Sequence, residues 1–234
     1  LKDLPPYVPQ AVIAIEDRRF YKHFGIDVFG LARAMAANVM AGGWVQGGST
    51  ITQQLAKNLF LTPEKTLRRK AQEALMAIYI DARFSKDDIL AAYLNRVYYG
   101  AGAYGIDAAS RTYFSKPARE LNVWQGAVLA GLLKAPSRFS PATNPPLARE
   151  RAKTVIAAMV DAGFLPEKKL KQSIKDLESG KMAGSGAGDL NRYFADWVLS
   201  LLDGFIVEGA QDLVVKTTLS PTLQKKKKKE QKAL

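Results

Sequence analysis

The segment GGSTITQQLAKN, residues 47–58, joins a glycine-rich loop to an amphipathic helix. Ser49 or Thr50 is the predicted N-cap, because a hydroxyl oxygen there accepts a hydrogen bond from a free N–H group of the first turn. Free N–H groups and the helix dipole favour anions at such a helix start. Thr50, Gln54 and Lys57 share one face, being spaced at i, i+4 and i+7. The segment therefore predicts either an anion-binding helix start or a capped surface helix with a solvated polar stripe.

The rest of the chain is helical in pattern on both sides of this segment. Prolines, glycines and capping residues separate the apolar runs, the Gly/Ser-rich run 179–189 reads as a linker, and the alternating run 212–219 is typical of a strand. We therefore expect a mainly α fold, with a helical domain over 1–180 and a linker with a short α/β appendage over 181–234. The predicted helices cover 9–21, 28–41, 50–59, 62–84 and 192–202, and others begin at Ser85, Asn122, Asn144 and Pro166.

The composition is that of an ordinary globular protein with excess positive charge. Of 234 residues, 47% are hydrophobic, and the net charge is +12, with the lysine run 225–229 most simply a solvated tail. Such charge favours nucleic acid, acidic lipid or diphosphate as partners. The lack of cysteine excludes thiol catalysis, and a single histidine argues against a histidine metal site. No run approaches the ~20 apolar residues of a membrane span, and the start at Leu1 reads like a cut inside a longer protein.

An acidic pair, Glu16 and Asp17, closes the first apolar run. On most helices such a pair is solvated surface. Here Glu16 follows Ile13 and Ile15 and precedes Phe20 by one helical turn. Apolar neighbours raise the pKa of a carboxyl by desolvation, which is what a general base near neutral pH requires. The pair is therefore a candidate catalytic site.

A cationic cluster, Lys65, Arg68, Arg69 and Lys70, begins the predicted long helix, where the helix dipole does not favour positive charge. Glu73 shares a face with the last two of these residues. The cluster is either a surface ion-pair helix or a site that an anion compensates. Two carboxylates alone would suggest glycoside hydrolysis. Cations change that interpretation, because a departing diphosphate needs them and a neutral glycosidic oxygen does not.

At these residues the sequence resembles the peptidoglycan glycosyltransferases, glycosyltransferase family 51, found in class A penicillin-binding proteins and monofunctional transglycosylases. Five blocks agree in order over about residues 5–165, which is far more specific than one. Gln125 departs from the glutamate usual in the fifth block, and we interpret it as structural. The resemblance implies a lysozyme-like helical fold. The blocks are EDRRFYKHFG at 16–25, GGSTITQQLAKN at 47–58, RKAQE at 69–73, the run from ILAAYLN at 89 to Gly105, and the run from GAVLAGL at 126 to Pro141.

The resemblance implies that Glu16 is the general base for polymerisation of lipid II. The 4-hydroxyl oxygen of the acceptor N-acetylglucosamine would attack the donor N-acetylmuramic acid opposite its diphosphate, which forms a β-1,4 bond and releases polyprenyl diphosphate. Glu73 would orient the cations or a divalent ion, magnesium or manganese, although no cofactor is expected to be required. The other implied residues are Lys57, Lys65, Arg69 and Lys70 for the diphosphate, Ser49, Thr50, Gln53, Gln54 and Asn58 for sugar and phosphate oxygens, and Asp17, Phe20 and His23 as support.

The segment 24–44 is rich in large apolar residues. It is either an ordinary core helix or, by the resemblance, a loop and helix that dip into the outer face of the cytoplasmic membrane. The resemblance also implies an extracytoplasmic location, an N-terminal anchor missing from this chain, moenomycin-type inhibitors and no nucleic-acid partner. Residues 214–224 resemble the linker to a transpeptidase domain, whose Ser-x-x-Lys motif is absent here.

Two other functions remain open from the sequence. A lysozyme-like hydrolase or lytic transglycosylase would share the fold and an acidic catalytic residue, but would not need Lys57, Arg69 and Lys70. A basic module that binds nucleic acid or membranes without catalysis would explain the charge alone, although acidic residues embedded among the cations count against it.

Overall fold

The computed structural model describes residues 1–43, 47–60 and 66–182. These residues belong to one compact unit, Leu1–Ala183. The described part is mainly helical, as predicted, and its one β feature is an isolated bridge between Tyr98 and Tyr104. The predicted strand at 212–219 and helix at 192–202 lie outside it. The helices are α1 (Tyr7–Glu16), η1 (Phe20–Lys22), α2 (Val28–Met40), α3 (Ile51–Phe60), α4 (Leu67–Arg83), α5 (Lys86–Arg96), α6 (Ile106–Phe114), η2 (Ala118–Glu120), α7 (Val123–Leu132), α8 (Pro145–Asp161), η3 (Glu167–Lys169) and α9 (Leu170–Ser179).

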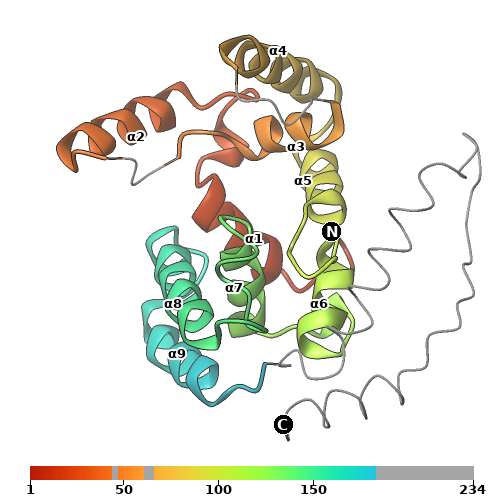
Figure 1. The fold of residues 1–234 in the computed structure, drawn as a ribbon, viewed down its shortest axis with the longest axis vertical. Coiled ribbons are helices and arrows are strands. Elements are labelled where there is room, and N and C mark those ends of the chain that lie inside the picture. Colours follow the sequence, from red (N-terminus) through yellow and green to blue (C-terminus); the bar gives the residue numbers. More distant parts are fainter. Residues whose placement is uncertain (44–46, 61–65, 183–234) are drawn as a thin grey trace, which may run out of the picture. The chain divides into compact units, whose positions relative to one another are not determined.

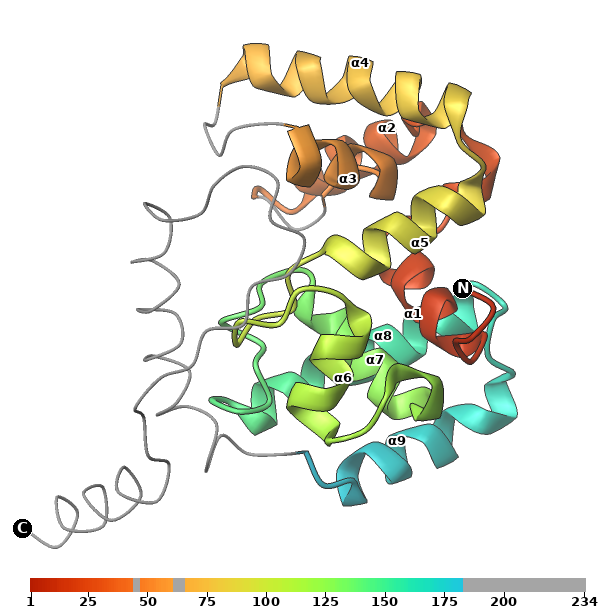
Figure 2. The ribbon, with the colours of Figure 1, turned by 90° about the vertical axis from the view of Figure 1, so that its right-hand side faces the viewer.

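Two groups of helices meet at α1. In the first group α1 and α8 pack on α7, which is buried along nearly its whole length, and α9 covers α7 and α8. In the second group α3 packs against α4 and α5. Figures 1 and 2 show α3 and α4 at one end of this unit, α8 and α9 at the other, and α1 between them. The C-terminal end of α1, which carries the Glu16–Asp17 pair, can therefore receive side chains from both groups.

Side-chain caps fix several of the predicted helix starts. Ser85, Asn122 and Asn144 each accept a hydrogen bond from a backbone N–H group of the first turn, at 3.1, 3.1 and 3.2 Å. Gln125 completes a capping box by accepting from the N–H of Asn122, which confirms its structural role. Such caps contribute about 1 kcal/mol each and act within one turn, so a sequence pattern locates them well.

The first helix ends earlier than predicted. Asp17 leaves the helical conformation, with φ −156° and ψ 74°, so α1 stops at Glu16 rather than at Tyr21, and Phe20–Lys22 form a separate 3₁₀ turn. The prediction was wrong because apolar residues continue beyond the acidic pair and mimic helical periodicity.

The start of α4 also differs from the prediction, whereas α2 begins at Val28 as predicted. Helix α4 begins at Leu67 with Thr66 as its cap, and not at residue 62. Asp27 occupies the N-cap position of α2 but makes no capping hydrogen bond; its carboxylate instead accepts from Nε of Arg19 at 3.2 Å. Helix α6 was not predicted, because it follows a glycine-rich loop and its N-cap residue, Gly105, has no side chain that would signal a helix start.

Helix α2 leaves most of its apolar side chains uncovered, and in Figure 1 it extends away from the other helices. Only Gly30 and Ala34 are buried in it, whereas Phe29 is 74% exposed and Met40 88% exposed. The prediction of an ordinary core helix is therefore wrong. Residue 44, the tryptophan of this segment, lies outside the described residues. No helix in the described ranges has the length and apolar character needed to span a bilayer.

Candidate active site

A cleft of about 710 Å³ surrounds the carboxyl group of Glu16. Glu16 is the last residue of α1, so its side chain leaves the end of the helix rather than its flank. Residues 47–50 and α3 form part of the cleft wall, and residues from the α7–α8 region form another part. The charged and polar lining side chains are those of Glu16, Asp17, Arg18, Asp27, Arg33, Ser49, Thr50, Gln54, Lys57, Lys134 and Arg151.

Gln54 connects Glu16 to a buried tyrosine. Nε2 of Gln54 donates to Oε2 of Glu16 at 2.9 Å, and the hydroxyl of Tyr93 donates to Oε1 of Gln54 at 2.8 Å. Tyr93 is 0% exposed. An amide that uses both ends cannot turn over without losing both hydrogen bonds. Tyr93 therefore fixes the amide, and the amide fixes the carboxylate.

Burial makes Glu16 a stronger base than an exposed carboxylate. Desolvation raises its pKa above the ordinary value, and the neighbouring charge of Asp17 adds to the rise. The Gln54 hydrogen bond and the charges of Arg151 and Lys134 act in the opposite direction but do not cancel the effect. Burial also raises the pKa of Tyr93 well above its usual range, so this hydroxyl stays protonated and donates. The carboxylate is thus suited to accept a proton.

Asp17 joins three segments at the bottom of the site. Its carboxylate accepts from the backbone N–H of Ile51, the first residue of α3, at 3.0 Å, and lies 2.9 Å from Nε2 of His23. The ring of Phe20 meets the His23 ring edge-on with centroids 6.2 Å apart. Asp17, Phe20 and His23 therefore fix α3 against the end of α1, which holds Gln54 opposite Glu16.

Thr50 and Gln53 form a reciprocal cap at the start of α3. The hydroxyl of Thr50 accepts from the N–H of Gln53 at 3.1 Å, and Oε1 of Gln53 accepts from the N–H of Thr50 at 2.9 Å. The same hydroxyl donates to the carbonyl of Gly25 at 2.6 Å. Gly25 has φ +84°, and a Cβ there would lie 2.5 Å from the carbonyl oxygen of Ala77 in α4. Both side chains thus shape the loop, and their predicted contact with substrate stays a prediction.

Glu73 gathers the cations of α4. This carboxylate is 2% exposed and accepts from Nη1 of Arg69 at 2.8 Å and from Nζ of Lys70. Nζ of Lys70 also donates to the hydroxyl of Ser49 at 2.9 Å, and Ser49 lines the cleft. The α4 cluster therefore reaches the edge of the cleft through Ser49, whereas Lys57 lines the cleft directly.

The structure brings together only part of the predicted site. Six predicted residues line the cleft, namely Glu16, Asp17, Ser49, Thr50, Gln54 and Lys57. The others that the structure describes are not among the lining residues: Phe20, His23, Gln53, Asn58, Arg69, Lys70 and Glu73. Of these, Asn58 is exposed near the end of α3. Lys65 lies outside the described residues.

The sequence did not identify two cations of the opposite wall, Lys134 and Arg151. Lys134 follows α7 inside the fifth block, so the block itself was the available signal. Arg151 lies in α8 among alternating charges that look like an ordinary solvated helix. Only the packing of α8 on α1 brings it to Glu16.

A helical domain with a half-buried carboxylate in a cationic cleft is typical of enzymes that act on glycosyl bonds, and comparison with known proteins gives the family. Residues 1–160 match the family model described as "Transglycosylase". The chain belongs to this family and is a peptidoglycan glycosyltransferase domain of the kind found in penicillin-binding proteins.

Several relatives are similar over most of this chain. Penicillin-binding protein 1F of Bacillus subtilis (strain 168) is 49% identical over 168 residues, 72% of this chain and 24% of that protein. Penicillin-binding protein 1A of Aquifex aeolicus (strain VF5) is 41% identical over 217 residues, 92% of this chain and 29% of that protein. A crystal structure of penicillin-binding protein 1A from Haemophilus influenzae is 24% identical, with a TM-score of 0.39 over 68% of this chain and 20% of that one. The chain thus spans about a quarter of the length of the curated relatives.

Proposed function

We propose that this domain polymerises lipid II into glycan strands by inverting β-1,4 transfer, with Glu16 as the general base. The observation that carries the proposal is the shared cleft: Glu16, its pKa raised by burial, faces the same space as Lys57. A proton acceptor beside a cation is the pair that a displacement with an anionic leaving group needs.

In the proposed reaction Glu16 takes the proton of the acceptor 4-hydroxyl while that oxygen forms a bond to the anomeric carbon of the donor. The bond from that carbon to the diphosphate oxygen breaks, and the electron pair leaves with the diphosphate. Lys57 would stabilise this developing charge directly, and Lys70 would do so at the edge of the cleft beside Ser49. Glu73 would hold Arg69 and Lys70 in place through its two carboxylate oxygens. Lys65 would assist from its place next to the same cluster in the sequence.

The described ranges offer few protein ligands for a divalent ion near the diphosphate. They contain no group of three or more His, Asp or Glu side chains placed to hold a metal. Both oxygens of Glu73 already accept from cations. The described side chains at the site do not fit a resident metal centre, and a magnesium or manganese ion would take its ligands from the diphosphate itself.

We further propose that α2 enters the outer face of the cytoplasmic membrane, where the polyprenyl tails of both substrates reside. Support comes from its exposed apolar side chains, which water does not favour and an interfacial membrane site does. Arg33 of the same helix lines the cleft, so a lipid-linked substrate could pass from the membrane to Glu16 along one element. Moenomycin-type inhibitors would compete for this cleft.

The test is elongation of lipid-linked substrate. The protein is incubated in detergent or vesicles with lipid-linked disaccharide-pentapeptide, with and without magnesium, and the products are separated by gel electrophoresis. We expect glycan strands and released polyprenyl diphosphate. In a parallel reaction with purified glycan strands alone, we expect no shortening; degradation there without elongation would instead favour a hydrolase or lytic transglycosylase.

A further inference from the structure

A mostly buried ion pair connects α3, α4 and α5 behind the candidate active site. Nζ of Lys86, the first residue of α5, donates to Oδ2 of Asp81 in α4 at 2.6 Å. The same oxygen accepts from the hydroxyl of Thr52 in α3 at 3.2 Å, and Thr52 is fully buried. These three residues are not among those that line the cleft, so a role in the reaction would have to act through other side chains.

Lys86 also contacts the turn that follows the acidic pair. Its Nζ lies 4.8 Å from the centroid of the Phe20 ring, a cation–π distance. Phe20 is fully buried, and its ring meets the His23 ring edge-on. His23 lies 2.9 Å from the carboxylate of Asp17, which accepts from the first N–H group of α3. The contacts that leave α3 through the ion pair therefore return to α3 at the neighbouring residue.

These contacts form a closed network around the start of α3. We call it the Lys86 network, and its members, in order of contact, are Thr52, Asp81, Lys86, Phe20, His23, Asp17 and Ile51.

The ion pair of this network fixes geometry more than it adds stability. The side chains of Asp81 and Lys86 are 10% and 19% exposed, so both groups lose most of their hydration. That loss offsets much of the Coulomb attraction, and apolar side chains of similar volume are often as stable. An ion pair differs from apolar packing in its directionality, because Nζ must meet the carboxylate and the face of Phe20 at the same time. The pair therefore fixes how α3, α5 and the turn at Phe20 lie relative to one another.

The position of α3 decides where the amide of Gln54 meets the carboxylate of Glu16. Gln54 follows Thr52 by two residues on α3, and its Nε2 donates to Oε2 of Glu16 at 2.9 Å. Glu16 directly precedes Asp17, which is also a member of the network. Both partners of this hydrogen bond are thus attached to the Lys86 network, and a displacement of about 1 Å between catalytic groups can lower a rate about 10²-fold.

We propose that Lys86 is a positioning residue of the transfer reaction, which holds the amide of Gln54 against Glu16 from outside the cleft. Its charge is paired with Asp81, so it serves the geometry of the site rather than the diphosphate. This inference rests on the proposed function and extends it to the start of α5.

Steady-state kinetics with lipid II separate positioning from plain stability. Lys86→Met removes the charge and nearly keeps the length, whereas Lys86→Arg keeps a cation that can pair with a carboxylate and lie over an aromatic ring. At a temperature where melting curves show both variants folded, we expect kcat of Lys86→Met to fall about 10- to 100-fold with KM little changed. Lys86→Arg should recover most of that loss.

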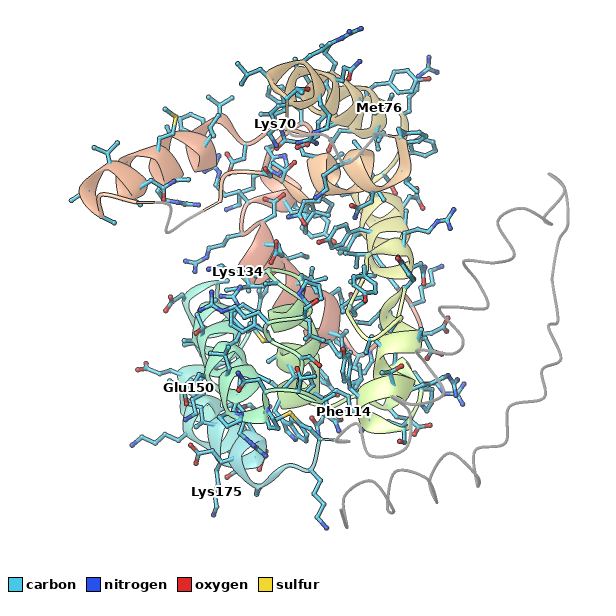
Figure 3. The ribbon with its side chains drawn as sticks, viewed as in Figure 1. Lys70, Met76, Phe114, Lys134, Glu150 and Lys175 are labelled. Carbon is cyan, nitrogen blue, oxygen red and sulfur yellow. The ribbon has the colours of Figure 1, made fainter. Side chains whose placement is uncertain are left out.

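Lys153 provides a matched control. It also joins two helices, because it pairs with Glu150 of α8 and Glu178 of α9. Figure 3 shows Glu150 toward one end of this unit and Met76 of α4 toward the other, so the control pair lies away from the Lys86 network. Lys153→Met should leave kcat unchanged.

The single histidine of the chain gives a readout that needs no substrate. Because His23 is the only histidine, untagged protein has one imidazole Cε1–H signal in its NMR spectrum. The Phe20 ring lies beside the imidazole, so this signal reports the position of that ring. We expect Lys86→Met to shift the signal and Lys153→Met to leave it in place.

Three results would overturn the inference: a Lys86→Met variant that melts lower but keeps wild-type kcat, a raised KM with unchanged kcat, or an unchanged His23 signal. If Lys86→Met does not fold, Thr52→Val decides instead, because it removes only one hydroxyl from the network. A several-fold lower kcat in Thr52→Val supports the inference, and a wild-type kcat overturns it. If the wild-type protein elongates nothing, the proposed function fails and this inference fails with it, a result distinct from variants that match an active wild type.

Discussion

Replacement of Glu16 by glutamine should remove activity and stabilise the fold at the same time. Gln54 donates to Oε2 of Glu16, and a glutamine oxygen can accept that hydrogen bond in the same place. The substitution therefore keeps the shape and the local hydrogen bond while it removes a proton acceptor and a buried negative charge. A residue present only for stability would show the opposite pattern.

The stability effect follows from the raised pKa of this carboxyl. Because burial raises the pKa of Glu16, the folded protein binds this proton more tightly than the unfolded chain does. Its contribution is most favourable below the ordinary carboxyl pKa and is lost as pH rises through the raised value. A tenfold difference in proton affinity corresponds to about 1.4 kcal/mol, and 1 kcal/mol moves Tm by about 2–4 °C in a chain of this size. Glu16→Gln should therefore melt a few degrees higher at pH 7.5 and no higher at pH 4.

Activity should fall about 10²–10⁴-fold, the usual contribution of a general base. In the wild type the rate should rise with pH through the raised pKa of Glu16, and the residual rate of the variant should lack that step. Elongation of lipid II and thermal melting at two pH values give both measurements on one preparation. A variant that melts lower at neutral pH, or retains wild-type turnover, would refute the assignment.

Three further substitutions test the supports of the site. Tyr93→Phe leaves the partly buried Oε1 of Gln54 without its donor, so the free energy of unfolding measured by urea titration should fall by about 1–3 kcal/mol. The midpoint of the pH–rate profile from initial rates should move upward, because the amide would then hold the Glu16 carboxylate less firmly. Asp17→Asn weakens the acceptor for the first N–H group of α3, so the free energy of unfolding in urea should fall by about 1–2 kcal/mol. An unchanged free energy of unfolding would show that Asp17 has no capping role. Gly25→Ala should lower Tm by more than Gly42→Ala. Both glycines have positive φ, but an added Cβ would lie 2.5 Å from a carbonyl oxygen at Gly25 and would meet nothing within 4 Å at Gly42.

The helices that the sequence located best are those with local signals. Ser85, Asn122 and Asn144 act within one turn of their own position, so their caps were readable without the fold. The end of α1 was not readable in this way, because it depends on Asp17 turning out of the helix to meet α3.

The residues of the candidate site also differ in whether a local sequence pattern could identify them. Glu16 and Lys57 lie in compact blocks and were found, whereas Arg151 reaches the cleft only through the packing of α8 against α1. The helical spacing predicted that Gln54 lies on a polar face. It could not show that the hydroxyl of Tyr93, from another helix, donates to the amide oxygen of Gln54. Contacts between distant segments depend on tertiary packing, which no local pattern encodes.

Because the side-chain amide of Gln54 donates to Glu16 and accepts from Tyr93, few other residues could replace it. A glutamate could accept from the tyrosine but would bring a second carboxylate against the first, and the pair would then share one proton instead of leaving one base free. Asparagine is one methylene too short to span both partners, and leucine would remove both hydrogen bonds. Only a neutral side chain of this length, with a donor at one end and an acceptor at the other, holds the Glu16 carboxylate in place without adding a second negative charge beside it.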